Sequence, residues 1–184
     1  MRVIAGTARG TKLSALPGED ITRPTVDRVK EAMFSSLQFL LPGARVLDLF
    51  AGSGQLGIEA LSRGAQVCTF VDENAAAIRV VTANCRAAGL EEKSRIVSQG
   101  AAAFLANTPQ EYDVILLDPP YRRGILENIL PAVAQATAAG GTVLCESEKG
   151  LKLPEEVGGL KQKKQHKYGT VLVTRYVKEQ ADEY

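Results

Sequence analysis

The stretch RVLDLFAGSGQLG, residues 45–57, decides the fold. Its first half is an apolar run of the length of one buried strand, and its second half is rich in glycine and leads into a helical pattern. Gly52, Gly54 and Gly57 keep the spacing Gly-x-Gly-x-x-Gly, in which glycines permit a tight turn and a close approach of the backbone to a ligand. The stretch therefore predicts a strand, a loop and a helix that hold a nucleotide-like ligand, and it leaves the identity of that ligand open.

Strand-like and helix-like runs alternate on the C-terminal side of this stretch. We expect strands over residues 45–50, 66–71, 94–98, 113–117 and 142–146, and helices over about 56–63, 75–88, 102–105 and 125–138. Such alternation is typical of parallel βαβ units with helices on both faces of the sheet. Residues 161–167 and 170–177 are too close in the chain for a crossover helix, so they predict an antiparallel hairpin. The predicted fold class is α/β and Rossmann-like, with a mostly parallel sheet.

The remaining segments are interpreted as additions to this sheet within one domain, because 184 residues suit a single core. Glycines and prolines interrupt the first segment, which favours a small β-hairpin or an extended arm. Apolar residues at helical spacing predict a leading helix next. The predicted division is an arm or hairpin over 1–24, a leading helix over 25–42, a cofactor-binding core over 43–150, and a C-terminal hairpin with a polar tail over 151–184.

The composition argues against several classes of protein. The chain has 22 basic and 21 acidic residues, so net charge alone does not indicate a nucleic-acid binder. Its three cysteines, Cys68, Cys85 and Cys145, form no Cys-x-x-Cys pair, which argues against a disulfide framework and a zinc site. The start has no signal-peptide pattern, and no apolar run approaches the roughly 18 residues of a membrane span. We expect a cytoplasmic monomer without a membrane span or a bound metal.

Two acidic residues narrow the identity of the ligand. Asp48 ends the first strand, where its carboxylate would repel a pyrophosphate and attract the sulfonium and ammonium groups of S-adenosylmethionine. Asp72 ends the second strand, where it would accept hydrogen bonds from ribose hydroxyls in either kind of ligand. The alternative is that both carboxylates only cap the turns that follow them. The predicted cofactor-binding residues are Asp48, Phe50, Ala51, Gly52, Ser53, Gly54, Asp72 and Asp118.

Asp118-Pro119-Pro120-Tyr121 directly follows the predicted strand over 113–117. The first and fourth strands of such a sheet are usually neighbours, so this corner and the glycine-rich loop should face one crevice. The amine of a nucleobase is a poor nucleophile, because its lone pair is delocalised into the ring. Asp118 and the backbone carbonyl of Pro119 can each accept one N–H of that amine, and two prolines hold these acceptors in place. Tyr121 offers a face on which a flipped base can stack.

We therefore predict that Asp118, Pro119, Pro120 and Tyr121 form the catalytic corner of a methyltransferase. The alternative is a rigid turn capped by an aspartate, since Asp-Pro pairs often form turns.

Several segments together resemble the bacterial methyltransferases that modify N2 of a guanine in small-subunit ribosomal RNA. These segments are residues 2–6, 9–10, 22–25, 27–32, 48–54, 59–65, 118–121 and 168–170. The segment TRPT at 22–25 with DRV at 27–29 is the most selective, because Asp-Pro-Pro-Tyr is shared with many amino-methyltransferases. The resemblance implies a seven-stranded class I methyltransferase fold, S-adenosylmethionine as cofactor, and a ribosomal assembly intermediate as substrate rather than free RNA.

The chain departs from this family after the third predicted strand. The family tends to carry Asp or Asn before an alanine there, to bind the adenine amino group, whereas this chain has Gly100 before Ala101. The resemblance therefore assigns the adenine contact to Gly100 and to the backbone of Ala101.

Basic residues gather near both ends of the chain. Residues 1–30 hold six basic against three acidic residues, and residues 160–168 add four lysines and no acid. Two basic patches on a neutral chain are typical of an RNA clamp, in which phosphate contacts position the substrate. The alternative for the hairpin lysines is solvated surface charge. The predicted RNA-binding residues are Arg2, Arg9, Arg23, Arg28, Lys30, Lys161, Lys163, Lys164 and Lys167.

Three other functions stay open at this point. The same tetrapeptide serves adenine-N6 methylation of DNA or RNA, although 184 residues leave little room for a target-recognition region. The glycine spacing also permits a nucleotide-dependent oxidoreductase, for which the sequence shows no acid/base couple. A module that binds S-adenosylmethionine or RNA without catalysis would not need Asp118.

Overall fold

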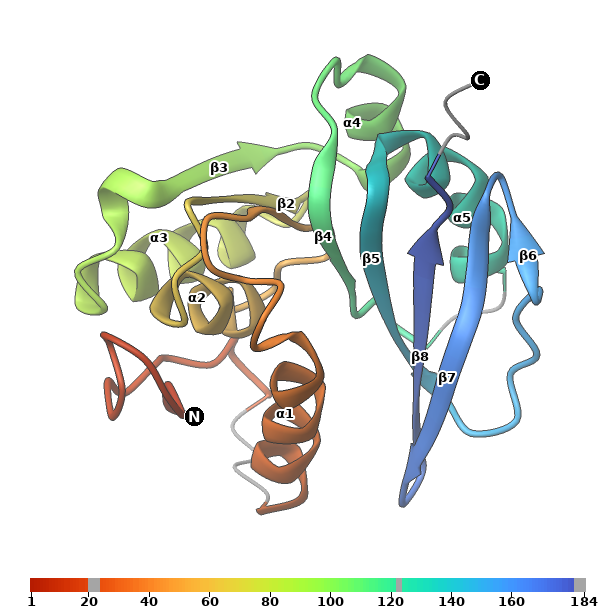
Figure 1. Cartoon of the computed structure of the whole chain (residues 1–184). Helices are drawn as coiled ribbons and strands as arrows, with labels where there is room; N and C mark the ends of the chain where they lie inside the picture. The colour runs from red at the N-terminus through yellow and green to blue at the C-terminus, as the bar shows by residue number, and fades with distance from the viewer. Residues whose placement is uncertain (20–23, 122–123, 181–184) are drawn as a thin grey trace.

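Strands drawn from most of the chain meet in one mixed sheet (Figure 1). The computed structural model describes residues 1–19, 24–121 and 124–180. The helices are α1 (Pro24–Leu37), α2 (Gln55–Ser62), α3 (Ala75–Ala87), α4 (Ala101–Asn107) and α5 (Ile125–Ala136), with a short 3-10 helix η1 (Glu91–Lys93). The strands are β1 (Arg45–Asp48), β2 (Val67–Asp72), β3 (Ser94–Ser98), β4 (Tyr112–Leu117), β5 (Thr137–Glu148), β6 (Glu156–Val157), β7 (Leu160–Tyr168) and β8 (Val171–Lys178).

The strand order is β3-β2-β1-β4-β5-β8-β7-β6. Strands β1 to β5 pair in parallel, and β5, β8, β7 and β6 pair antiparallel. This confirms the predicted mostly parallel sheet with an antiparallel C-terminal hairpin, and it places β1 beside β4. Within the described residues the sheet has eight strands rather than the seven that the resemblance implied. The addition is the two-residue β6, which pairs with the start of β7 through Val157 and Leu160.

Two apolar cores cover the two faces of the sheet. Phe34 of α1 and Leu116 of β4 belong to the core beneath α1, α2 and α3. Ile115 of β4 and Leu130 of α5 belong to the core beneath α4 and α5. Ile115 and Leu116 are neighbours in sequence and point into opposite cores, as the alternation of a strand requires. The continuous apolar run of β4 therefore follows from its burial on both faces.

The predicted N-terminal β-hairpin is wrong. Among residues 1–19 the described pairing is a single antiparallel bridge between Arg2 and Lys12. Backbone hydrogen bonds flank this bridge, with the N–H groups of Val3 and Leu13 donating to the carbonyls of Thr11 and Met1 at 3.0 Å each. The pairing does not extend into strands, and the N–H groups of Ile4 and Ala5 donate to the Glu59 carboxylate of α2 at 2.9 and 3.1 Å. The segment is therefore an arm folded against α2 rather than a sheet of its own.

Several predicted boundaries also move, and the two largest changes concern the leading helix and β5. The leading helix ends at Leu37 rather than residue 42, because the next residues turn back, with the N–H of Leu41 donating to the carbonyl of Leu37 at 3.1 Å. Strand β5 begins at Thr137 rather than residue 142, because Thr137 already pairs with Tyr112 before an irregularity shifts the register. Neither change moves the carboxyl ends of β1, β2 and β4, where the predicted site residues gather.

Candidate active site

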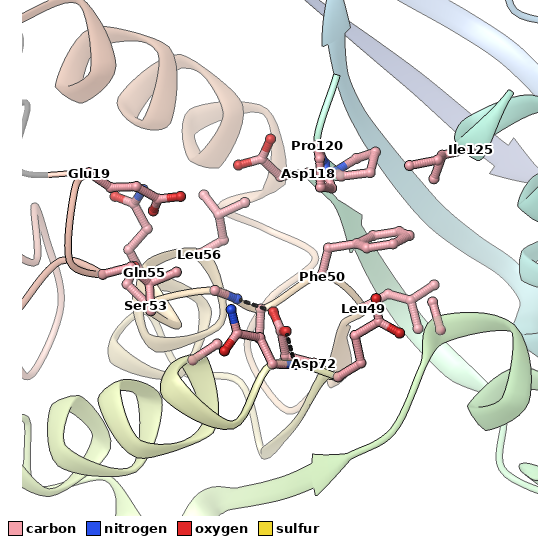
Figure 2. Close-up of a pocket in the computed structure, with 18 of the residues that line it drawn as sticks. Glu19, Leu49, Phe50, Ser53, Gln55, Leu56, Asp72, Asp118, Pro120 and Ile125 are labelled. Atoms are coloured by element: carbon pink, nitrogen blue, oxygen red, sulfur yellow. Dashed lines mark hydrogen bonds between the residues drawn. The ribbon is translucent and has the colours of Figure 1, made fainter. Parts of the chain in front are cut away.

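A cavity of about 580 Å³ lies at the carboxyl ends of β1, β2 and β4 (Figure 2). This volume falls within the usual range of small-molecule sites. The glycine-rich loop, the end of β2, the start of α4 and the Asp-Pro-Pro-Tyr corner all contribute to its lining. Predicted site residues in the lining are Phe50, Ala51, Gly52, Ser53, Asp72, Ala101, Asp118, Pro119, Pro120 and Tyr121. The structure thus brings the predicted cofactor loop and the predicted catalytic corner to one cavity.

The carboxylate of Asp72, at the end of β2, accepts hydrogen bonds from the glycine-rich loop and from the start of α3. The backbone N–H of Gly52 donates to Asp72 Oδ2 at 2.9 Å, and the N–H of Asn74 donates to Asp72 Oδ1 at 2.9 Å (Figure 2). Gly57 has a different task, because a Cβ at this position would lie 2.3 Å from the ring of Phe70. The first glycine therefore lies at the cavity, and the last one lets α2 pack closely on β2.

Asp48 lies beneath the loop rather than in the cavity wall. Its side chain is buried, its Oδ2 accepts the N–H of Gly57 at 3.0 Å, and its Oδ1 has no hydrogen-bond partner within the described residues. Burial, and secondarily the charge of Asp72, raises the pKa of Asp48 to about 7. The cavity lining also leaves out Gly54 and Gly100, and Gln99 and Ala101 flank the place of Gly100.

The cavity is acidic. Glu19, Asp72, Glu73 and Asp118 line it, and among the described residues no Lys, Arg or His does. Figure 2 shows Glu19, Asp72 and Asp118 spread around the cavity. Gln55 adds a buried carbonyl oxygen, Oε1, with no partner in the described part of the chain. The cavity therefore suits a ligand with positive charge and N–H donors, and it would repel a diphosphate.

Sequence reasoning missed two of these carboxylates. Glu73 directly follows Asp72, so the pair of acids at the end of a strand could have indicated it. Glu19 belongs to the N-terminal arm and reaches the cavity only because the arm folds onto α2. No local pattern could have indicated that contact.

The Asp-Pro-Pro-Tyr corner combines a half-buried carboxylate with an exposed ring. Burial, followed by the charges of Glu146 and Asp48, raises the pKa of Asp118 well above the usual range of an aspartate. Pro119 is buried, whereas Tyr121 is 51% exposed. Burial and the nearby carboxylates raise the pKa of Tyr121 to about 12, so its hydroxyl stays protonated. The corner offers an acceptor next to a flat, accessible surface.

The predicted RNA-binding residues fall into four groups. Arg2, Arg9, Arg28, Lys163, Lys164 and Lys167 are exposed, and Lys161 is ion-paired with Glu179. Arg23 lies outside the described residues. Lys30 is a correction: its side chain is only 2% exposed, and its Nζ donates to the carbonyl of Arg2 at 2.7 Å and lies 3.8 Å from Glu59. A buried ammonium that holds the arm in place cannot contact an RNA phosphate.

The described helices include none with the length and apolar character that crossing a bilayer requires. The same residues contain no cluster of three or more His, Cys, Asp or Glu side chains that could hold a metal ion.

The strand order, the loop after β1 and the corner after β4 define the class: this is an α/β protein of the methyltransferase type. Comparison with known proteins identifies the group within that class. The chain belongs to the family described as "Conserved hypothetical protein 95", whose model matches residues 1–177.

Members of known sequence and structure agree with this assignment. The chain is 39% identical to "Putative rRNA methyltransferase YlbH" of Bacillus subtilis, over 97% of this chain and 99% of that protein. It is 39% identical to "Ribosomal RNA small subunit methyltransferase D" of Escherichia coli K12, over 71% of this chain and 65% of that protein. The solved structure of "Putative methyltransferase yhhF from Escherichia coli" has a TM-score of 0.85 and 32% identity, and the match covers 98% of this chain and 99% of that one.

Proposed function

We propose that this protein transfers a methyl group from S-adenosylmethionine to the exocyclic N2 amine of a guanine in small-subunit ribosomal RNA. The observation that carries this proposal is the meeting of the glycine-rich loop with Asp118-Pro119-Pro120-Tyr121 at one acidic cavity. The relatives named above as ribosomal RNA methyltransferases supply the substrate class. We further propose that residues 1–184 act as one domain, with the arm, the leading helix and the C-terminal hairpin around the cofactor-binding core.

The cavity fits S-adenosylmethionine by charge and by hydrogen bonding. Four carboxylates favour its sulfonium and ammonium groups, and charge-assisted hydrogen bonds are worth roughly 1.5–3 kcal/mol each. Asp72 would hold the ribose hydroxyls, since each carboxylate oxygen can accept more than the one N–H that it now accepts. The unpartnered Oε1 of Gln55 would accept an N–H of the ammonium group. When bound, this cofactor supplies the electrophilic methyl group.

Asp48 would act indirectly in this scheme. Its Oδ2 holds the N–H of Gly57, and its charge lies beneath the loop, outside the cavity wall. We propose that it favours the cationic cofactor through the electrostatic field and through the position of the loop. Gly100 and Ala101 would contact the adenine ring, with Ala101 in the lining of the cavity.

The corner would activate the amine. Asp118 would accept one N–H and the carbonyl of Pro119 the other, which directs the lone pair of the amine toward the methyl group. Burial makes the Asp118 carboxylate a stronger base than an ordinary aspartate, so it would also take up the proton that the methylated amine releases. Tyr121, half exposed beside Asp118, would stack on the flipped guanine.

Methyl transfer from labelled S-adenosylmethionine to small-subunit particles tests this function. The particles come from a strain that lacks the activity, and nucleosides are separated after digestion. We expect label in N2-methylguanosine with the wild-type protein and, at the same reaction time, about 10²–10³-fold less with Asp118→Ala. Label in adenosine, or in protein, would overturn the assignment. Parallel reactions with protein-free ribosomal RNA test whether an assembly intermediate is the substrate.

A further inference from the structure

A second cavity, of about 180 Å³, lies between α1 and the C-terminal strands. Ala32, Met33 and Ser36 of α1 form one wall, and Lys164, His166 and Arg175 of β7 and β8 form the other. Figure 1 shows α1 and the tip of the β7–β8 hairpin extending past the carboxyl end of β4 in the same direction. The cavity therefore lies between two elements that extend beyond the end of the sheet where the catalytic corner lies.

This cavity has the opposite charge to the cofactor cavity. Three basic or potentially basic side chains line it, and no acidic side chain of the described residues does. Among those residues Lys164, His166 and Arg175 take part in no ion pair. Arg175 Nε is moreover buried and without a hydrogen-bond partner in the described structure.

Lys164 and Arg175 are also paired directly across the two strands. Like charges in this position destabilise a sheet, so the arrangement costs stability unless an anion lies between them. A buried guanidinium N–H without an acceptor adds to that cost. A bound anion would remove both costs, and a guanidinium matches the geometry of a phosphate. The arrangement therefore favours a site for a phosphate group.

The cavity also lies at a useful distance from the catalytic corner. Leu144 lines it and pairs with Leu116 of β4, and Asp118 follows two residues further along. Leu144 also pairs with Arg175 of β8, and Arg175 pairs with Lys164 of β7, so these two basic residues lie two and three strands from β4. Two residues along and two or three strands across amount to about 12–16 Å. A phosphate held by these side chains would thus be about two nucleotides from a base at Asp118.

We propose that this cavity binds a backbone phosphate of the RNA about two nucleotides from the methylated guanine. The inference rests on the proposed function for the identity of the RNA. Lys164, His166 and Arg175 hold the phosphate, and Tyr168 lies next to it, with its ring centroid 6.1 Å from that of His166. An aromatic side chain there offers a stacking surface for the adjoining base. The three basic groups thereby fix the register of the strand, while the corner acts on the base.

His166 makes a direct test possible, because it is the one histidine in the sequence. Its imidazole NMR signals report on this cavity alone, whether or not methyl transfer occurs. We expect a short single-stranded RNA to shift these signals, while the matching nucleosides, which lack phosphate, leave them unchanged. Arg175→Gln should weaken this binding roughly tenfold. Inorganic phosphate that binds as tightly as the RNA would overturn the RNA assignment, and unshifted signals with every probe would overturn the site.

Methyl transfer gives the second readout. Lys164→Ala should raise KM for the particle and lower the slope of log affinity against log salt by about 1, as the loss of one phosphate contact does. Lys93→Ala removes the same charge from η1, at the opposite edge of the sheet, and should change neither. If Lys164→Ala and Lys93→Ala had the same KM and the same salt dependence, the phosphate site would be overturned, while the proposed function would stay intact.

The two proposals can also fail separately. No label in guanine, together with RNA-dependent shifts of His166, would reject the methylation and retain the phosphate site. Calorimetry with S-adenosylmethionine and thermal unfolding confirm that each variant is folded. Arg175→Lys is the second variant at the partly buried position, because it keeps the charge within β8, and its RNA affinity should lie between wild type and Arg175→Gln.

Discussion

Glu146 of β5 stands beside Asp118 at the end of β4, because Leu117 and Cys145, the residues just before them, are partners in the parallel pairing of the two strands. After burial, the charge of Glu146 is the largest cause that raises the pKa of Asp118. Burial also raises the pKa of Glu146 itself. The proposed acceptor of the amine N–H thus has its basicity raised first by burial and then by a neighbour outside the Asp-Pro-Pro-Tyr corner.

Glu146→Gln should move the acid limb of the pH–rate profile to lower pH. Asp118 must be ionised to accept an N–H, so the rate rises as pH increases through its pKa, and removal of the adjacent charge lowers that pKa. The profile of kcat at saturating cofactor and particle measures the shift. Glu148→Gln is the control, because Glu148 lies on the same strand and is not among the charges that raise the pKa of Asp118, although it contributes to that of Tyr121. If the acid limb of Glu146→Gln stayed at the pH of the wild type, the proposed effect of Glu146 on the pKa of Asp118 would be contradicted.

Asp118→Ala should lower kcat by about 10²–10³-fold, as the loss of one preorganised polar contact to the reacting group does. The Kd for S-adenosylmethionine should change much less, because Glu19, Asp72 and Glu73 remain in the cavity. The same variant should unfold at a higher temperature near neutral pH, since it lacks a carboxylate whose charged form burial disfavours. Single-turnover rates, calorimetry and thermal unfolding measure the three effects. Wild-type turnover would refute the role of Asp118.

The alternation of strands and helices could be predicted because each element carries its own period and turn residues. The run RVLDLFAGSGQLG indicates a strand, a loop and a helix locally, and the parallel order follows from general rules of βαβ connection. The two loops that line the cofactor cavity were predicted for the same reason. Those parts of the site depend on where strands end, which is a local property of the chain.

The parts that could not be predicted depend on contacts between distant segments. Whether the N–H groups of Ile4 and Ala5 pair within a hairpin or with Glu59, more than fifty residues away, is decided by packing. The same contact buries Lys30, whose sequence context is that of a surface residue. Asp48 illustrates the limit most clearly, because its position at a strand end was correct, while the direction of its side chain was not visible in the pattern.

Asp48→Asn should remove one component of the pH dependence of stability. The folded state raises the pKa of Asp48 from 3.8 to about 7, so it binds this proton more strongly than the unfolded chain does. The free energy of unfolding of the wild type therefore falls as pH rises through this window, by an amount of the order of 4 kcal/mol from this group. Urea unfolding at a series of pH values, compared with Asp48→Asn, isolates the effect.

Asp113→Asn is the control, because its effect on the pH dependence of stability should have the opposite sign. The hydrogen bond from Arg45 lowers the pKa of Asp113, so this group stabilises the fold above its unfolded pKa and loses that effect as pH falls. The free energy of unfolding of the wild type relative to Asp113→Asn should therefore rise with pH. Relative to Asp48→Asn, it should fall with pH. The same slope in both comparisons would show that burial of Asp48 is not the cause.

Gly6→Ala should destabilise the protein much more than Gly10→Ala, although both glycines have a left-handed backbone, with φ of +88° and +85°. A Cβ at Gly10 meets no atom within 4 Å, so this variant should lose only the roughly 1–2 kcal/mol of left-handed strain. A Cβ at Gly6 would lie 1.9 Å from the carbonyl oxygen of Ser62 in α2, so the arm must move away from that helix.

Displacement of the arm should also weaken cofactor binding. The arm carries Leu16 and Glu19 into the lining of the cavity, so displacing it from α2 removes one wall and one carboxylate. We therefore expect Gly6→Ala to weaken binding of S-adenosylmethionine as well as stability, and Gly10→Ala to leave the binding unchanged. Urea unfolding and calorimetry on the two variants measure both effects. If Gly6→Ala lowered stability and bound the cofactor as the wild type does, the arm would be a structural clamp on α2 and not a part of the site.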